Sequence, residues 1–90
     1  MYKIFYSSRM ERDMDLMCRR GKSLKKLENI LNLLAAGKSL PPKFRDHELS
    51  GKYRGVRECH IEPDWLLMYQ ILKDKLIVYA LRTGTHSDLF

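Results

Sequence analysis

Hydrophobic spacing along the chain predicts one strand, two helices and then three further strands. Residues 3–6 are rich in aromatic and β-branched types, which is typical of a strand. Apolar residues then recur at intervals of three and four, as on one face of a helix, over two stretches that begin at Ser8 and Ser23. In the first stretch they are Met10, Met14 and Met17, and in the second they are Leu24, Leu27, Ile30 or Leu31, and Leu34.

Local signals set the bounds of the two helices. Ser8 and Glu11 have the spacing of a capping box, so the first helix is expected to begin at Ser8. Gly21 follows two arginines and predicts the end of that helix. A second helix ends before Pro41-Pro42, since proline cannot continue it, and residues 38–53 are predicted to form a loop.

The second half of the chain predicts a meander of three strands. They are expected at residues 54–61, 65–72 and 76–81. Pro63-Asp64 makes the first turn, because proline already has the backbone angle of the second turn position. The middle strand is almost continuously apolar, which favours a central strand covered on both faces. Arg82 ends the last strand, and a short polar tail follows.

This order of elements predicts an α+β fold with the sequence β-α-α-β-β-β. We expect an antiparallel-rich sheet with the helical hairpin packed on one face, and the other face available for a ligand. Ninety residues support one hydrophobic core, so residues 1–90 are expected to form a single domain.

Charge narrows the possible partners. Seventeen Lys and Arg against 11 Asp and Glu give a net charge of +6 and a pI near 9.5. This bias favours polyanions, namely nucleic acid, an anionic membrane or an acidic protein, although a solvated lysine-rich surface has the same composition. Five cations near the turn between the helices could bind phosphate or be solvated: Arg19, Arg20, Lys22, Lys25 and Lys26.

Targeting signals are not evident. The first residues lack the apolar core of a signal peptide, and no run approaches the roughly 20 apolar residues of a membrane span. Cys18 and Cys59 lie in unrelated segments without metal-binding spacing, as expected for free thiols in a reducing compartment. We therefore expect a cytoplasmic protein that does not bind membranes.

The meander brings chemically active residues to one edge of the sheet. In such a meander the end of the first strand lies beside the start of the second and the end of the third. His60, Asp64 and Arg82 would therefore be neighbours. His86 follows Arg82 by four residues, and His47 lies in the long loop.

These side chains suit metal-independent cleavage of RNA by its own 2′-hydroxyl, which needs a base, an acid and a stabiliser of phosphorane charge. Histidine titrates near pH 6.5, arginine binds phosphate, and the rings of Trp65 and Phe90 could stack on bases, worth about 1–3 kcal/mol per base. Three histidines without clustered cysteines or paired carboxylates argue against a metal site, and no cofactor is expected. Taken singly, the same residues have structural roles: a histidine at a strand end forms hydrogen bonds, Asp64 forms a turn, and Trp65 lies in a core.

Three segments closely resemble the YafQ branch of the RelE/ParE toxin superfamily. They contain DHELSG within residues 40–51, ECHIEPDWLL within residues 57–69, and RTGTHSDLF at residues 82–90. The resemblance implies a RelE-like two-layer fold and the toxin of a type II toxin–antitoxin pair. Such toxins are small endoribonucleases that enter the 30S A site of the ribosome and cut mRNA there without a metal. A cognate antitoxin, commonly of the ribbon-helix-helix type, blocks the site and brings the complex to operator DNA.

The resemblance also implies roles for individual residues. The catalytic group is His47, His60, Asp64 and His86, the phosphate contact is Arg82, and the residues that shape the site are Trp65 and Phe90. As a hypothesis, Asp64 takes the proton of the 2′-hydroxyl and His86 protonates the leaving oxygen, while the two remaining histidines position phosphate. Acid and base could be exchanged among these four residues.

Two other functions are compatible with the fold. One is a ParE-like poison of DNA gyrase, which cuts no RNA and has no need of the three histidines. The other is an RNA-binding module whose histidines are structural.

Overall fold

Five strands form one mixed sheet in the spatial order β1-β5-β4-β3-β2. The computed structural model describes residues 1–90. The strands are β1 (Lys3–Tyr6), β2 (His47–Glu48), β3 (Arg57–Glu62), β4 (Trp65–Leu72) and β5 (Ile77–Gly84), the helices are α1 (Ser8–Arg19), α2 (Leu24–Ala35) and α3 (His86–Leu89), and the 3-10 turns are η1 (Pro42–Phe44) and η2 (Gly51–Tyr53). None of the helices is long and apolar enough to cross a membrane.

The sheet confirms the predicted architecture. β3, β4 and β5 form an antiparallel meander, and β1 adds to the outer edge of β5 in parallel. β4 is the central strand, and residues 65–69 within it are all buried. The fold is therefore α+β with an antiparallel-rich sheet.

Several element bounds differ from the sequence prediction. The loop expected at residues 38–53 contains the short strand β2, which pairs with the start of β3. β3 begins at Arg57 because η2 and a turn at Gly55, whose φ is +89°, occupy the preceding residues. β5 continues past residue 81 to Gly84, since its last residues still pair with β4.

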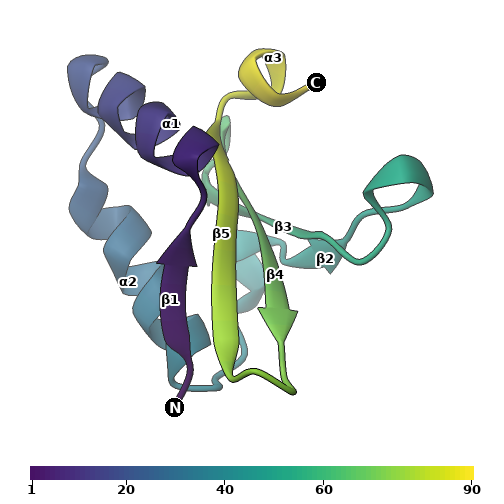
Figure 1. Cartoon of the computed structure of the whole chain (residues 1–90). Coiled ribbons are helices and arrows are strands. Elements are labelled where there is room, and N and C mark those ends of the chain that lie inside the picture. Colours follow the sequence, from purple (N-terminus) through teal and green to yellow (C-terminus); the bar gives the residue numbers. More distant parts are fainter.

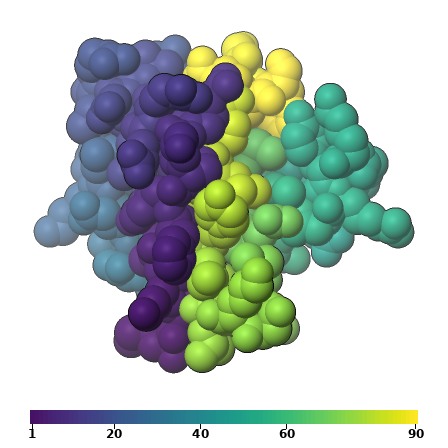
Figure 2. Space-filling view, viewed as in Figure 1, coloured from purple at the N-terminus to yellow at the C-terminus, as the bar shows by residue number.

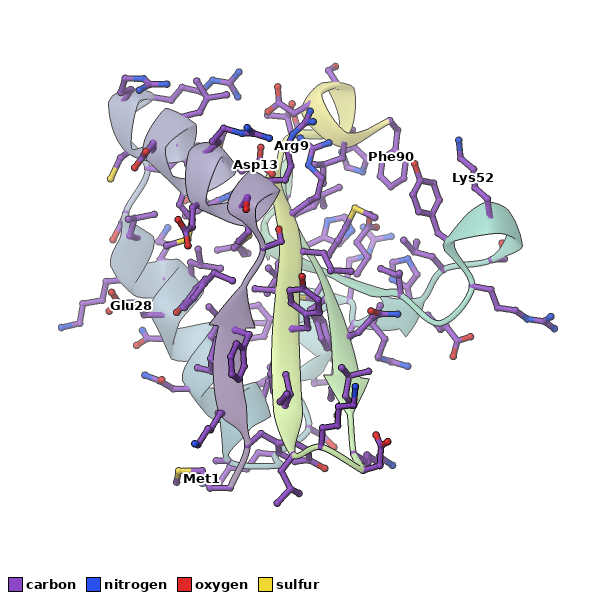
Figure 3. All side chains as sticks on the ribbon, viewed as in Figure 1. Met1, Arg9, Asp13, Glu28, Lys52 and Phe90 are labelled. Carbon is purple, nitrogen blue, oxygen red and sulfur yellow. The ribbon has the colours of Figure 1, made fainter.

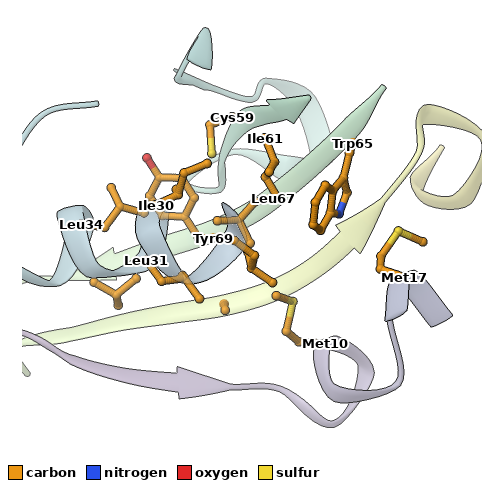
Figure 4. Close-up of a cluster of buried hydrophobic side chains, with 13 residues drawn as sticks. Met10, Met17, Ile30, Leu31, Leu34, Cys59, Ile61, Trp65, Leu67 and Tyr69 are labelled. Carbon is orange, nitrogen blue, oxygen red and sulfur yellow. The ribbon is translucent and has the colours of Figure 1, made fainter. Parts of the chain in front are cut away.

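α1 and α2 pack on one face of the sheet, as expected (Figure 1). Met10 and Met17 of α1 project into the core toward the β4 side chains Trp65 and Leu67 (Figure 4). Met14 is only partly buried. Burying a side chain of this size is worth about 1.5–3 kcal/mol, so the methionine stripe holds α1 to the sheet.

The first helix begins at Ser8, as predicted, but its N-cap is not the predicted residue. Ser7, not Ser8, is the N-cap, and its hydroxyl accepts the backbone N–H of Met10 at 2.9 Å. The same hydroxyl donates to the carbonyl of Leu81 in β5 at 2.7 Å. The predicted capping box of Ser8 and Glu11 is therefore wrong, because the bond to β5 selects Ser7.

The other face of the sheet is covered in part, whereas the sequence predicted that all of it stays free. Leu66, Met68 and Leu89 form a second apolar cluster on that face. It is packed by partly buried side chains that come mainly from the segment before β3: Leu49, Tyr53, Val56 and Leu81. Figure 2 shows this segment as a teal lobe on the side of the molecule away from α1 and α2. His60 pairs with Leu66 on this face and stays partly exposed, so the face remains open to a ligand where β3 ends.

Candidate active site

Three of the predicted residues meet where β3, β4 and β5 reach the same edge of the sheet. The Nδ1 of His86 lies 2.7 Å from Oδ1 of Asp64, and the backbone N–H of His86 donates to the same oxygen at 3.0 Å. The rings of His60 and His86 are 5.8 Å apart between centroids and tilted by 57°. The predicted meeting of His60, Asp64 and His86 is therefore confirmed.

These contacts fix how each imidazole presents its nitrogens. A carboxylate can only accept, so Nδ1 of His86 carries a proton and its Nε2 faces away from Asp64. The Nδ1 of His60 lies 3.2 Å from the carbonyl of Pro63, which likewise can only accept. Each ring therefore keeps Nε2 for a ligand. The two bonds from His86 hold the pKa of Asp64 below its ordinary value.

The short helix α3 holds His86 in place. Thr85 caps it, and the carboxylate of Asp88 accepts the backbone N–H of Thr85 at 2.8 Å to complete a capping box. Arg20, at the end of α1, grips the same carboxylate with distances of 2.7 and 3.2 Å. These donors hold the pKa of Asp88 well below its usual range. The tail is thus anchored to the helical layer rather than free.

His47 lies one strand away from this pair, on β2. It is paired in register with Glu58, and Glu58 is two residues from His60 on the same face of β3. The Nδ1 of His47 lies 2.8 Å from the carbonyl of Arg45, and its Nε2 lies 3.5 Å from Oε1 of Glu58. His47 is therefore on the same face as His60, but it does not join the contact between Asp64 and His86.

Arg82 is already paired. Its Nε and Nη2 donate to the two oxygens of Asp13, at 2.9 and 3.1 Å, and Thr83 donates its backbone N–H to the same carboxylate at 3.2 Å. The pairing raises the pKa of Arg82. Asp13 comes from α1, which crosses beside the end of β5 (Figure 3). The Nη1 edge of the guanidinium makes no hydrogen bond.

The two aromatic candidates have different surroundings. Trp65 is fully buried on the helix face, and its Nε1 donates to Oγ1 of Thr83 at 2.9 Å. The prediction that its ring is open for stacking is therefore wrong, because β4 points this side chain into the core. Phe90 is 60 % exposed and packs edge-to-face against Tyr53 at 5.7 Å. Figure 3 shows Phe90 near Lys52, at the corner between α3 and η2.

A family profile described as the bacterial toxin YafQ of type II toxin–antitoxin systems matches residues 2–90. The chain belongs to the YafQ family. It is 42 % identical over 88 residues to the mRNA interferase toxin YafQ of Escherichia coli K12, an alignment that covers 97 % of this chain and 94 % of that protein. The resemblance inferred from the three segments is thereby confirmed.

Solved structures of bacterial toxins, YafQ among them, share the whole fold. A metal-bound toxin from Helicobacter pylori superposes with a TM-score of 0.94 at 39 % identity, covering all of both chains. YafQ from E. coli BL21(DE3) gives a TM-score of 0.91 at 37 % identity, covering 100 % of this chain and 99 % of that one. YafQ in the E. coli DinJ–YafQ complex gives 0.89 at 38 % identity, with the same coverage.

Three acidic residues of this YafQ-family site were missed in the sequence. Asp13 lies between Met10 and Met17 on the apolar face of α1, and a carboxylate at such a position must find a partner. Glu58 alternates with His60 along β3, and it is 5 % exposed with an Oε2 that has no hydrogen-bond partner. Asp88 follows Thr85 at the spacing of a capping box. Each of these positions can be recognised in the sequence, but only after the buried faces of the helix and the strand have been assigned.

No group of three or more His, Cys, Asp and Glu side chains in the chain is arranged so that it could hold a metal ion. Cys59 is buried in the core, and burial raises the pKa of its thiol to about 12. Cys18 is exposed on α1.

Proposed function

We infer that this chain is the toxin of a type II toxin–antitoxin pair and acts as an mRNA endoribonuclease, by attack of a 2′-hydroxyl on the adjacent phosphate. The observation that carries the inference is the pair of imidazoles His60 and His86, 5.8 Å apart, of which only one is bonded to a carboxylate. Two such rings can exchange protons with the attacking and leaving oxygens of one phosphodiester. The interferase name of the E. coli relative supports the same activity.

His86 is proposed as the acid. Asp64 accepts its Nδ1–H, so the carboxylate stabilises the charged ring, and Nε2–H is left to protonate the departing 5′-oxygen. Asp64 already accepts two hydrogen bonds and has a lowered pKa, so it is a poor base. We therefore revise the role suggested from sequence. Asp64 orients His86 rather than taking the 2′-proton.

His60 is proposed as the base. A neutral carbonyl accepts its Nδ1–H, which leaves a lone pair on Nε2 of the uncharged ring to take the 2′-proton. The Nη1 edge of Arg82 stabilises the charge that develops on the phosphorane oxygens, and Asp13 positions that guanidinium. His47 contacts phosphate from β2, and Phe90 stacks on a base. Trp65 supports the end of β5 from the core, because its Nε1 donates to the hydroxyl of Thr83, the residue after Arg82.

The finer partners are also proposals. We propose that residues 1–90 act as one domain in the cytoplasm and cut mRNA in the 30S A site of the ribosome. The net charge of +6 suits a site lined by ribosomal RNA. A cognate antitoxin, by analogy with DinJ in its complex with YafQ, would cover the corner, and a ribbon-helix-helix half of that antitoxin would bring the complex to operator DNA.

Cleavage is proposed to need no metal, because the two imidazoles and Arg82 supply every proton and charge that the reaction needs. The toxin from H. pylori is metal-bound. Imidazole nitrogens are common metal ligands, so a metal at this corner would occupy the same Nε2 atoms that move protons. We therefore expect cleavage to persist in EDTA and to be inhibited by added transition metals.

The test is cleavage of a defined message by the purified protein, with and without ribosomes, mapped by primer extension. We expect cuts that leave a 2′,3′-cyclic phosphate or 3′-phosphate and disappear when the 2′-hydroxyl at the cut is replaced by hydrogen. His86→Ala and His60→Ala should each lower the rate about 10²–10⁴-fold. If both variants cut as fast as the wild type, the nuclease assignment is wrong. If the protein cuts no RNA but inhibits supercoiling by DNA gyrase, the ParE-like alternative is supported instead.

A further inference from the structure

A groove of about 450 Å³ opens beside the catalytic corner, between α2, η1 and the end of β3. Its floor is apolar and is made by four side chains: Ile30, Leu33, Phe44 and Ile61. His60 and Pro63 form the wall that the groove shares with the corner. The volume lies within the range of about 300–1,000 Å³ that is typical of ligand pockets.

The rim of the groove is positively charged. Lys26, Lys43 and Arg45 line it, and Glu62 is its one carboxylate. Glu62 is already neutralised, since it pairs with Lys26 at 2.8 Å and with Lys22 at 2.7 Å. Lys43 and Arg45 have no carboxylate within ion-pair distance. Two cations beside an apolar floor therefore remain without an anion.

We propose that this groove binds the nucleotide next to the scissile phosphate of a single-stranded RNA. The base would lie on the apolar floor and its phosphate on Lys43 and Arg45. This combination of a flat apolar surface with a cationic edge is what single-stranded nucleic acid requires. Asn29 on the rim offers both a donor and an acceptor to a base edge. The proposal rests on the nuclease function and adds to it a second nucleotide site.

Continuity with the corner favours RNA over a peptide as the occupant. A strand whose phosphate lies between His60 and His86 can continue past His60 directly into the groove, because His60 borders both. Arg45 adds a second link, because its backbone carbonyl lies 2.8 Å from Nδ1 of His47. The residue that would bind the neighbouring phosphate is thus bonded to another proposed site histidine.

The test measures binding of a hexanucleotide with a 2′-deoxy residue at the cut, by fluorescence anisotropy across a range of salt. The variant is Lys43→Gln/Arg45→Gln, in which both positions stay polar and charge is removed. Loss of the contact to this one phosphate should lower the salt slope by about 0.7 and weaken binding about 5-fold at 0.1 M salt. Lys3→Gln/Lys75→Gln is the charge-matched control, because these residues lie beside the turn between β4 and β5, at the other end of the sheet from Pro63, and do not line the groove; it should bind within about twofold of the wild type.

The outcomes separate this inference from the proposed function. If the protein cuts RNA but the groove variant binds the oligonucleotide like the control, the groove inference alone is wrong. If the groove variant loses binding while the wild type cuts no RNA, the groove stands and the nuclease assignment fails. If the groove variant binds RNA normally but loses its antitoxin, the groove is a protein-docking site and the inference is overturned. Asn29→Ala should, in addition, change the preference for the base beside the cut at least threefold.

Discussion

Replacement of Asp13 by Asn should weaken both the fold and the site, although Asp13 touches no RNA. The carboxylate accepts three hydrogen bonds, two from Arg82 and one from the backbone of Thr83. An amide of the same shape keeps one oxygen and turns an N–H toward a guanidinium N–H. At least one charge-assisted hydrogen bond is lost, together with the ion pair.

The expected cost is about 2 kcal/mol. A hydrogen bond to a charged group is worth about 1.5–3 kcal/mol, and breaking a fully buried ion pair costs about 3–5 kcal/mol. The side chain of Arg82 is 25 % exposed, so water replaces part of what is lost and the lower end of these ranges applies. In a domain of this size, about 2 kcal/mol lowers the melting temperature by roughly 8–16 °C.

Urea unfolding of Asp13→Asn, Arg82→Met and the double variant measures the coupling between the two side chains. A double-mutant cycle should give at least about 1 kcal/mol. Asp15→Asn is the matched control on the same helix, because Asp15 is exposed and makes no ion pair, and it should change stability by less than about 0.5 kcal/mol. Cleavage by Asp13→Asn should fall through kcat, as expected when a loosened Arg82 no longer meets the transition state. A coupling energy near zero would refute the reasoning.

The remaining predictions concern the cap, the thiols and the tail. Ser7→Ala should lower the unfolding free energy by about 1 kcal/mol, whereas Ser8→Ala should change it by less than about 0.5 kcal/mol, in urea titrations of both. A thiol reagent should modify the exposed Cys18 within minutes, while the buried Cys59, whose pKa burial raises to about 12, should react only at the rate of unfolding. The pKa of Asp88 is lowered in the folded state, so its ion pair at the end of α1 stabilises the protein above the unfolded pKa of about 3.9 and is lost as pH falls below it. Thermal melts from pH 7 to pH 2 should therefore show a steeper acid loss for the wild type than for Asp88→Asn, and parallel curves would contradict this linkage.

Patterns local in sequence predicted most of the fold. The spacing of Met10 and Met17 predicted the buried face of α1, and the apolar run at residues 65–72 predicted the central strand. The meander also predicted that His60 and Asp64 would lie near His86, because neighbouring strands joined by short turns have little freedom in their pairing.

The contacts that finish the site could not be predicted from local patterns. Asp13 and Arg82 are 69 residues apart, and Arg20 and Asp88 are 68 apart, so no local rule joins either pair. The Trp65 side chain could point to either face of the sheet, and only the register of β4 decides which face it occupies. The loop before β3 carries no periodic pattern, and its packing against Leu66 and Met68 depends on the completed sheet.

The place of β1 in the sheet sets the order in which the molecule can form. Residues 3–6 pair only with residues 77–80, so the earliest strand to leave the ribosome has no neighbour until almost the whole sheet has been synthesised. Paired residues are 74 positions apart, which corresponds to roughly 4–15 s of translation at about 5–20 residues per second. A ribosome-bound fragment that ends before residue 77 lacks β5, α3 and His86, so β1 has no strand partner and the contact between Asp64 and His86 cannot form.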